Sequence, residues 1–242
     1  MSLHLLAAGA SRGLVGALQP GFTAATGTDL VAFFGAAGLI RDKVLAGDNA
    51  DLIILTTALL DALAARGLLA GPVRPIGLAR TGVAVPAGRP CPDIATAASL
   101  RAALLEAPAL YVPDPEISTA GIHLMGVLRA LGIAAVLRPA LRPFPNGAAA
   151  MAHLAAAPEP GAIGCTQIPE IVDTEGLTLL GPLPAPHDLA TVYAAALRAG
   201  ARAQPAAEAL LALLTGPASA ALRQAHGFEP AAPTQQQETQ RP

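Results

Sequence analysis

The segment Tyr111–Gly132, YVPDPEISTAGIHLMGVLRALG, shows the unit from which most of the chain is built. An apolar strand, Ala109–Val112, leads into a turn at Pro113–Glu116, and a helix is expected to start at Ser118 or Thr119, both favourable first residues. The helix is indicated by apolar residues at helical spacing, namely Ile122, Met125, Leu128 and Leu131. Because the first turn of a helix has free backbone N–H groups and partial positive charge, such a junction can hold an anion.

The first seventy residues repeat this strand–turn–helix unit. Short apolar strands are predicted for Leu3–Ala8, Asp29–Phe34 and Asp51–Leu55. The turns that follow them are Gly9–Ser11, Gly35–Gly38 and Thr56–Thr57, and helices are expected through Leu14, Leu18 and Phe22, over Leu39–Leu45, and on to Arg66. This alternation predicts a parallel sheet covered by helices, whose ligands bind at the carboxyl ends of the strands.

The chain then crosses to a second unit and returns. Prolines from Pro72 to Pro92 punctuate one expected strand, about Ile76–Val85, and Thr191–Leu197 is interpreted as the strand that crosses back. Between them we predict strands at 109–112, 134–137, 161–164 and 177–180, and helices over 96–105, after 119, over 147–155 and from Thr166. Two closing helices are expected at 206–214 and 217–224.

We therefore predict an α/β protein of two lobes, each a mostly parallel sheet flanked by helices. The first lobe would comprise residues 1–79 and 195–230, and the second residues 80–194. The polar, proline-containing stretch 231–242 is expected to be a disordered tail. Two lobes joined by two crossing segments can close like a hinge around a small ligand.

The composition argues against several kinds of function. A net charge of −2, 3% aromatic residues and no Trp do not suit nucleic-acid binding, which needs a basic patch. No apolar run is long enough for insertion into a membrane. The His, Cys, Asp and Glu residues show no metal-ligand spacing, so we expect no metal and no cofactor. The surroundings of Cys91 and Cys165 favour free thiols, although a disulfide stays open.

The N-terminal sequence leaves the location of the protein open between two compartments. MSLHLLAAGASRGL lacks the basic region and the cleavage site of a secretory signal. The protein is then either cytoplasmic, or periplasmic with a leader removed before Met1.

Candidate ligand-binding residues lie at four strand–helix junctions and on the first crossing strand. They are Ala10, Ser11, Arg12, Gly35, Ala36, Ala37, Arg80, Thr119, Ala120, Thr166 and Gln167. Together they offer backbone N–H groups, hydroxyls and guanidinium groups, which suit a small anionic ligand. These residues can also have purely structural roles, because small residues serve tight turns and arginines can be solvated. Asp114 and Glu116, in the neighbouring turn, can likewise simply shape that proline-rich turn.

Several motifs resemble the type II periplasmic binding proteins of the molybdate-binding kind. The motif A-G-x-x-A-D-L stands here as Ala46, Gly47, Ala50, Asp51 and Leu52. The segment D-P-E-x-x-x-A-G-I begins at Asp114 and includes Ala120–Ile122, and the closing Leu214–Pro217 and His226–Phe228 fit as well. The resemblance covers Leu3 to about Glu229. It implies capture of a small anion by a monomer, for delivery to the membrane component of an ABC transporter.

The departures from that family argue against a tetrahedral oxyanion. Molybdate binders place serine hydroxyls at the first two junctions, where this chain has Ala10, with Ser11 one residue late, and Gly35–Gly38. The family's tyrosine near the last junction falls close to Gly164. The sequence is more similar to a branch of substrate-binding proteins that includes aconitate isomerase, at Leu78–Arg80, Pro92–Ile94, Gly164–Ile171 and Gly181–Pro184.

Two functions follow from these resemblances. The first is a solute-binding protein for a small organic di- or tricarboxylate, with molybdate or tungstate as a lesser alternative. The second is an isomerase of the aconitate type, which moves a proton along an allylic system and needs one base. His123 and Glu116 are the candidate catalytic residues for that reaction, and each has an ordinary structural role as its alternative.

Overall fold

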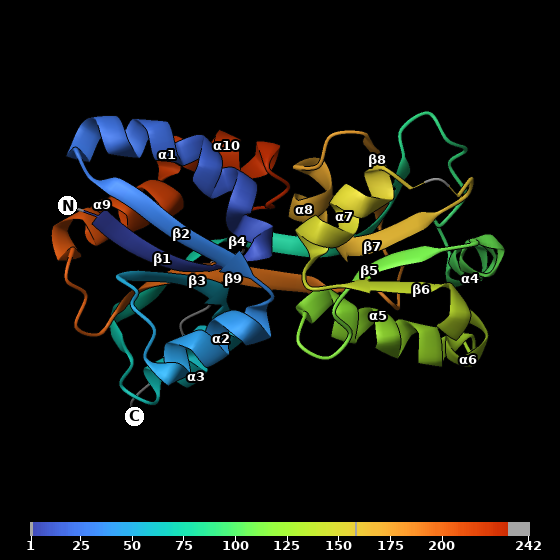
Figure 1. The fold of residues 1–242 in the computed structure, drawn as a ribbon, viewed down its shortest axis with the longest axis horizontal. Coiled ribbons are helices and arrows are strands. Elements are labelled where there is room, and N and C mark those ends of the chain that lie inside the picture. Colours follow the sequence, from blue (N-terminus) through green and yellow to red (C-terminus); the bar gives the residue numbers. More distant parts are fainter. Residues whose placement is uncertain (1, 158, 232–242) are drawn as a thin grey trace, which may run out of the picture.

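The computed structural model describes residues 2–157 and 159–231, and one sheet runs through this whole region. The strand order is β2-β1-β3-β9-β4-β7-β5-β6, with β8 also paired to β4 (Figure 1). Strands β1–β3 pair in parallel, as do β5, β6 and β7, whereas β4 and β9 are antiparallel to their neighbours. The two long strands β4 and β9 therefore join two parallel sheets, each of which carries helices (Figure 1).

One half of the molecule, which we call the first lobe, contains both ends of the described chain (Figure 1). Its elements are β1 (Ser2–Ala8), η1 (Gly9–Ser11), α1 (Arg12–Thr26), β2 (Asp29–Gly35), α2 (Ala37–Ala46), β3 (Leu52–Thr56), α3 (Thr57–Ala64), α9 (Gln204–Thr215), η3 (Pro217–Ser219) and α10 (Ala220–Ala225). All five residues of β3 are buried, which is typical of a central parallel strand covered on both faces. The connecting strands are β4 (Leu69–Pro86) and β9 (Ala190–Arg198).

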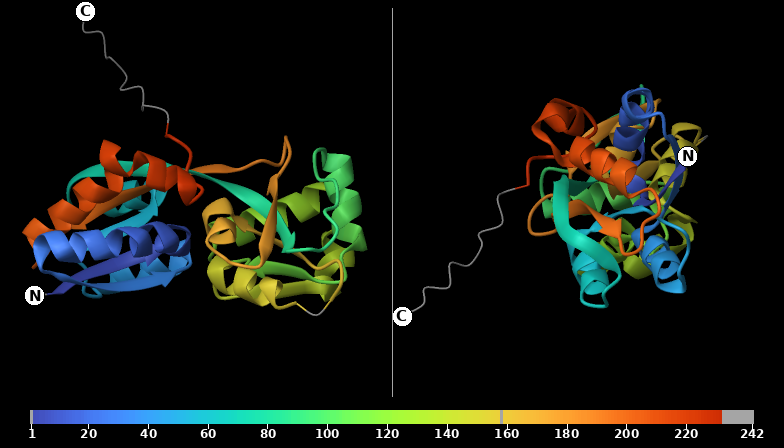
Figure 2. Two further views of the ribbon diagram at one scale, coloured as in Figure 1. Left: turned by 90° about the horizontal axis from the view of Figure 1, so that it is seen from above. Right: turned by 90° about the vertical axis from the view of Figure 1, so that its left-hand side faces the viewer.

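The middle of the chain forms the second lobe. Its elements are α4 (Ala97–Glu106), β5 (Leu110–Pro113), α5 (Thr119–Ala130), α6 (Ala134–Leu137), η2 (Arg138–Ala140), β6 (Leu141–Phe144), α7 (Gly147–Ala155), β7 (Ile163–Gln167), α8 (Ile168–Val172) and β8 (Leu177–Pro182). The view from above shows the two lobes side by side, connected by the long strands (Figure 2). The predicted α/β class is confirmed.

Each lobe has its own apolar core. The core of the first lobe takes residues from Leu3 to Ala79 and from Tyr193 to Phe228. The second lobe has two clusters on opposite faces of its sheet, within Val83–Leu183 and Ala84–Ile171. Because none of the apolar clusters formed by the described residues spans both lobes, apolar packing stabilises each lobe separately.

Two local predictions were wrong. Ala134–Leu137, predicted as a strand, is the short helix α6, and the strand is Leu141–Phe144. This strand was not predicted because it contains Pro143, which has no N–H donor for a neighbouring strand. β6 lies at the edge of the sheet, where such a residue is tolerated. Thr166, predicted to begin a helix, belongs to β7, and α8 begins at Ile168.

The expected strand Ile76–Val85 is part of a longer strand, β4, which begins at Leu69. The other predicted elements agree with the structure to within a few residues. The first helix ends before Gly27, whose φ of 63° is the left-handed conformation expected after a helix. Within the described residues, no single helix is long and apolar enough to cross a membrane, although α9 and the η3–α10 segment, bent by 53°, meet that criterion as a pair. The predicted tail lies outside the described residues except for Ala231.

Asp51 ties together three segments of the first lobe. Its carboxylate accepts backbone hydrogen bonds from His4 at 2.8 Å, Arg202 at 2.7 Å and Ala203 at 3.0 Å. Burial raises the pKa of this carboxyl, but the three hydrogen bonds outweigh burial and lower the pKa below its ordinary value. The Asp of the A-G-x-x-A-D-L motif therefore has a structural role: it connects β1 and the segment before α9 to the start of β3.

We expect Asp51→Ala to lower the free energy of unfolding by about 2–4 kcal/mol, because it leaves three backbone donors without an acceptor. Urea unfolding measures this change. The control is Asp48→Ala, which breaks only the partly exposed ion pair with Lys43 and should cost less than about 1 kcal/mol. Equal losses of unfolding free energy in the two variants would contradict this structural role of Asp51.

Candidate functional site

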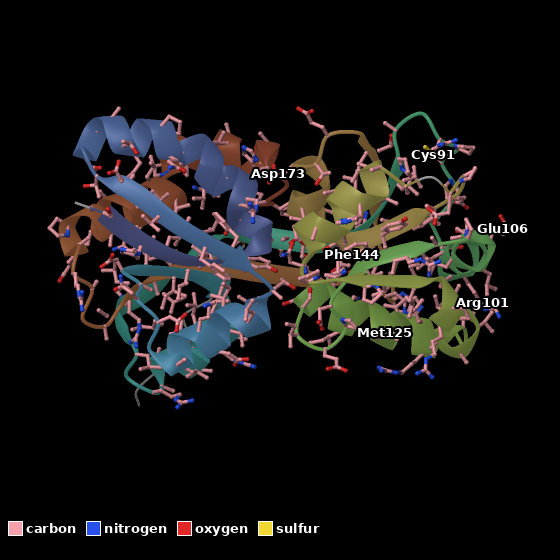
Figure 3. The ribbon with its side chains drawn as sticks, viewed as in Figure 1. Cys91, Arg101, Glu106, Met125, Phe144 and Asp173 are labelled. Atoms are coloured by element: carbon pink, nitrogen blue, oxygen red, sulfur yellow. The ribbon has the colours of Figure 1, made fainter. Side chains whose placement is uncertain are left out.

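The two lobes touch along a seam that is bridged on both sides of the connecting strands. On one side the Gly38 N–H of α2 donates to the Ile117 carbonyl at 3.1 Å. On the other side His226, after α10, lies 2.6 Å from an Asp173 oxygen at the end of α8. Figure 3 labels Asp173 where α8 faces the first lobe. The conformation is thus one in which the lobes are in contact.

Glycines in the junction turns make this contact possible. A Cβ at Gly38 would lie 2.8 Å from the Ile117 carbonyl oxygen, and a Cβ at Gly9 would lie 2.6 Å from a carboxylate oxygen of Glu170. At Gly13 a Cβ would overlap the Asp173 carboxylate. The first two junctions are therefore poor in side chains because the opposite lobe occupies that space.

A cavity of about 600 Å³ lies in the seam, between α2 and α3 of the first lobe and α5 of the second. It is lined by Ala37, Gly38, Arg41, Thr56, Thr57, Ala58, Leu59, Glu116, Ile117, Thr119, Ile122, His123 and Leu189–Val192. The first turns of three helices reach the lining, so their partial positive charges converge on it. Arg41 and His123 are its basic side chains and Glu116 its acidic one.

Two side chains of the cavity are oriented by carbonyl groups. His123 Nε2 lies 2.7 Å from the His187 carbonyl oxygen, so this nitrogen carries a proton and the neutral ring presents Nδ1 as its lone-pair atom. The Thr57 hydroxyl donates to the Val192 carbonyl at 3.3 Å. The walls are otherwise largely aliphatic, which is common in sites for organic ligands.

A polar cluster surrounds Glu170, between β7 and the first turn of α7. The Thr166 hydroxyl donates to a Glu170 carboxylate oxygen at 2.5 Å, and backbone N–H groups of Gly147, Ala148 and Gln167 also donate to this carboxylate. Burial raises the pKa of Glu170 to about 7, although these four hydrogen bonds lower it. Tyr193, also buried, has its pKa raised by burial and by the charge of Glu170.

Unpartnered polar atoms lie on the opposite face of the β4–β7 ladder from Thr166 and Glu170. The side-chain amide of Gln167 is 2% exposed, and neither its nitrogen nor its oxygen has a hydrogen-bond partner among the described residues. The same holds for the hydroxyl of Thr81, which is the register partner of Gln167 in the β4–β7 ladder. Buried polar atoms of this kind need water or a ligand group.

The structure distributes the predicted binding residues over three places. Ala37 and Thr119 line the cavity, as do the predicted catalytic residues His123 and Glu116. Ser11, Thr166 and Gln167 are buried; Ala10, Gly35, Ala36 and Ala120 are also buried but do not line the cavity. The Ser11 hydroxyl donates to the Ala8 carbonyl at 2.8 Å and so is used within its own turn.

The two predicted arginines point elsewhere. Arg12 is exposed and its guanidinium lies 4.8 Å from the centre of the Phe34 ring. Arg80 bonds Glu229 at 2.9 Å and lies 3.8 Å from Asp188, beside a separate surface pocket. Neither guanidinium is part of the cavity lining.

Sequence reasoning missed Glu170, Tyr193 and the Thr56–Thr57 pair. Glu170 had a signal: it is the only charged residue in the apolar stretch after β7, four residues beyond Thr166 and thus on the same side of a turn. Among the described residues no group of three or more His, Cys, Asp or Glu side chains could hold a metal ion. Cys91 and Cys165 are free thiols, and burial raises the pKa of Cys165 to about 12.

We expect the stability of the protein to fall between pH 5 and pH 8 because of Glu170. Its folded-state pKa of about 7 lies above the ordinary value of 4.5, so its contribution is complete below pH 4.5 and is lost as the pH rises through 7. The loss should approach about 3 kcal/mol relative to Glu170→Gln, which cannot ionise. Urea unfolding of both proteins across this range measures it, and parallel pH profiles would refute the assignment.

Comparison with known proteins gives a family match and a fold match. The sequence profile described as "Bacterial extracellular solute-binding protein" matches residues 3–229. The periplasmic molybdate-binding protein of Azotobacter vinelandii superimposes with a TM-score of 0.79 at 18% identity, covering 95% of this chain and 100% of that one. No curated protein matches the chain in sequence.

Two further solved structures share the fold. The substrate-binding domain of a putative molybdenum ABC transporter from Clostridium difficile has a TM-score of 0.68 at 14% identity, covering 96% of this chain and 99% of its own. PEB3 with bound L-phospholactate has a TM-score of 0.67 at 14% identity, covering 95% of this chain and 100% of its own. At such identities these likenesses establish the fold alone.

Proposed function

Because this chain belongs to the family of bacterial extracellular solute-binding proteins, we propose that it captures a small organic carboxylate in the seam cavity. The observation that carries the proposal is the cavity of about 600 Å³ between the lobes. Its volume lies within the range of sites for organic ligands and is far larger than a four-oxygen anion needs. A mostly aliphatic lining suits the carbon skeleton of such a ligand.

The charges around the cavity support an anionic ligand. The N-terminal turns of α2, α3 and α5 bring partial positive charge from both lobes, and Arg41, whose guanidinium also pairs with Asp42 at 2.8 Å, adds a cationic side chain. Thr56 and Thr119 supply hydroxyl groups that can donate to carboxylate oxygens. The related folds include proteins named for molybdate and one with bound L-phospholactate, which is an organic anion.

The connection between the lobes supports a role in transport. Because β4 and β9 are the connecting strands, a small bend in them would open or close the seam around a ligand. We propose that a membrane transporter of the ABC type binds the closed form. One protein of similar fold is the substrate-binding domain of a putative ABC transporter, which supports this proposal. The family consists of extracellular proteins, which supports a location outside the cytoplasm, and we propose the periplasm.

We expect di- or tricarboxylates such as citrate and the aconitates to raise the melting temperature of the protein. A ligand present at a hundred times its dissociation constant stabilises by about 2.7 kcal/mol, which thermal unfolding detects readily. A response to molybdate or sulfate alone would contradict the proposal.

A cavity variant tests where the ligand binds. Ala58 is exposed at the start of α3 and lines the cavity, so Ala58→Phe should fill it and abolish the ligand-induced shift. The matched control is Ala64→Phe, at the exposed end of the same helix and outside the lining, which should keep the full shift. If Ala58→Phe still responds like the wild type, the ligand binds elsewhere.

The positions of His123 and Glu116 on the cavity support a second candidate function, an isomerase of the aconitate type. A base would remove a proton from the CH₂ carbon of cis-aconitate and return it to the former vinyl carbon, which shifts the double bond and conserves all atoms. His123 suits this role because its Nδ1 carries the free lone pair.

Proton NMR of cis-aconitate incubated with the protein distinguishes the two functions. An isomerase should change the cis/trans ratio, and His123→Gln should slow that change by roughly 10²–10⁴-fold, the usual contribution of a general base. If the protein binds aconitate but the cis/trans ratio does not change, the isomerase function is excluded and the solute-binding function remains.

A further inference from the structure

Two acidic residues of the second lobe lie against the first lobe. Glu170 belongs to α8 and Asp173 directly follows this helix, which packs on η1 and on α1. A Cβ at Gly9 would lie 2.6 Å from a Glu170 carboxylate oxygen, and a Cβ at Gly13 would overlap the Asp173 carboxylate. Both carboxyl groups are therefore at the boundary that opens when the lobes separate.

Asp173 meets a histidine of the first lobe there. The Nδ1 atom of His226, after α10, lies 2.6 Å from Asp173 Oδ1, and the two side chains are 22% and 20% exposed. With a protonated imidazole this contact is an ion pair, and with a neutral imidazole it is only a hydrogen bond. Histidine ordinarily changes its charge between pH 5 and pH 8. Because opening separates the pair, protonation of His226 favours the closed form.

Glu170 acts in the same direction. Its carboxylate is buried on neutral donors, namely the Thr166 hydroxyl and backbone N–H groups, and burial raises its pKa to about 7. Gly9 of the first lobe lies against it, so separation of the lobes would expose the carboxylate to water. Water favours the charged form of a carboxyl group. A rise in pH, which ionises Glu170, therefore favours opening.

The cations on the surrounding elements are engaged elsewhere. The guanidinium of Arg12 in α1 lies 4.8 Å from the centre of an aromatic ring. Arg80 of β4 forms an ion pair with Glu229, and Arg223 of α10 donates to backbone carbonyls of its own lobe. Among the described residues, Asp173 has no ion pair besides the one with the histidine.

The other titratable groups near this contact do not supply the same effect. Tyr193 of β9 lies close enough to Glu170 for their charges to interact, but burial raises the pKa of this phenol, so it stays neutral. His123 and His153 each bond a backbone carbonyl of the second lobe, and Glu175 is exposed. The change of charge at the α8 contact near neutral pH thus comes from the two groups above.

We propose that the contact between α8 and the first lobe is a pH-sensitive latch, in which protonation of Glu170 and of His226 holds the seam closed. Both groups bind protons more readily when the lobes are in contact, so closure takes up protons and is favoured as the pH falls. Acidification should then strengthen ligand capture in the seam cavity, and a rise in pH should weaken it. This last consequence rests on the proposed function, whereas the latch is a property of the lobes themselves.

Hydrogen exchange of the Gly38 amide, measured by NMR without ligand, tests the latch. This N–H has no partner within the first turn of α2 and donates to the Ile117 carbonyl across the seam, so its protection reports lobe contact. Protection factors are corrected for the intrinsic pH dependence of exchange. We expect the factor to be about tenfold or more higher at pH 5.5 than at pH 8. Equal protection at the two pH values would overturn the proposal.

Variants assign the effect to the two groups. His226→Gln and Glu170→Gln keep hydrogen-bonding side chains that do not titrate, so each should lose part of the pH change in Gly38 protection and the double variant should lose all of it. The matched control is His153→Gln, which removes a histidine bonded within its own helix α7 and should keep the full change. A double variant with the pH dependence of the wild type would refute the latch.

The latch can be tested whether or not every variant folds and whichever ligand binds. If Glu170→Gln fails to fold, His226→Gln and Asp173→Asn test the ion pair alone, and an unchanged pH dependence in both would refute its role. Because the measurement uses no ligand, a failed carboxylate screen would contradict the proposed function without affecting this result. Protection of Gly38 that does not vary with pH would refute the latch and leave ligand capture intact.

Discussion

The close approach of the two lobes is the constraint on which the seam depends. Backbone and carboxylate groups of the second lobe come so near Gly9 and Gly38 that a methyl group at either position would collide with them. The Gly38 N–H, which has no partner within the first turn of α2, donates to the Ile117 carbonyl at 3.1 Å. The small-residue turns at the ends of β1 and β2 are thus explained by contact between lobes as well as by any ligand.

Separate apolar cores make this seam adjustable. Each lobe buries its own aliphatic side chains, and the contacts between lobes include single polar pairs such as Asp173–His226. Breaking a few such pairs costs far less than opening a core, because hydrogen bonds to water replace them. A protein of this design can open and close as two rigid bodies joined by strands.

The seam has two chemically different parts. The cavity is wide and largely aliphatic, with basic side chains and helix N-termini at its wall. The region around Glu170, beside the first turn of α7, holds a buried carboxylate on neutral donors. Burial of that carboxylate without a cation opposes its ionisation, which is why its pKa lies above the ordinary value.

The amino-acid sequence by itself determined the order of strands and helices, the α/β class and the helix-ending glycines, because hydrophobic periodicity and backbone propensity are local properties. It misplaced the strand Leu141–Phe144, because the edge position that tolerates Pro143 is defined only by the neighbouring strands. Only the tertiary structure decided that Arg80 turns to Glu229 and Asp188, and that Glu170 lies against Gly9. Both facts depend on contacts between residues far apart in the chain, and no local pattern encodes which distant partner a charged side chain will meet.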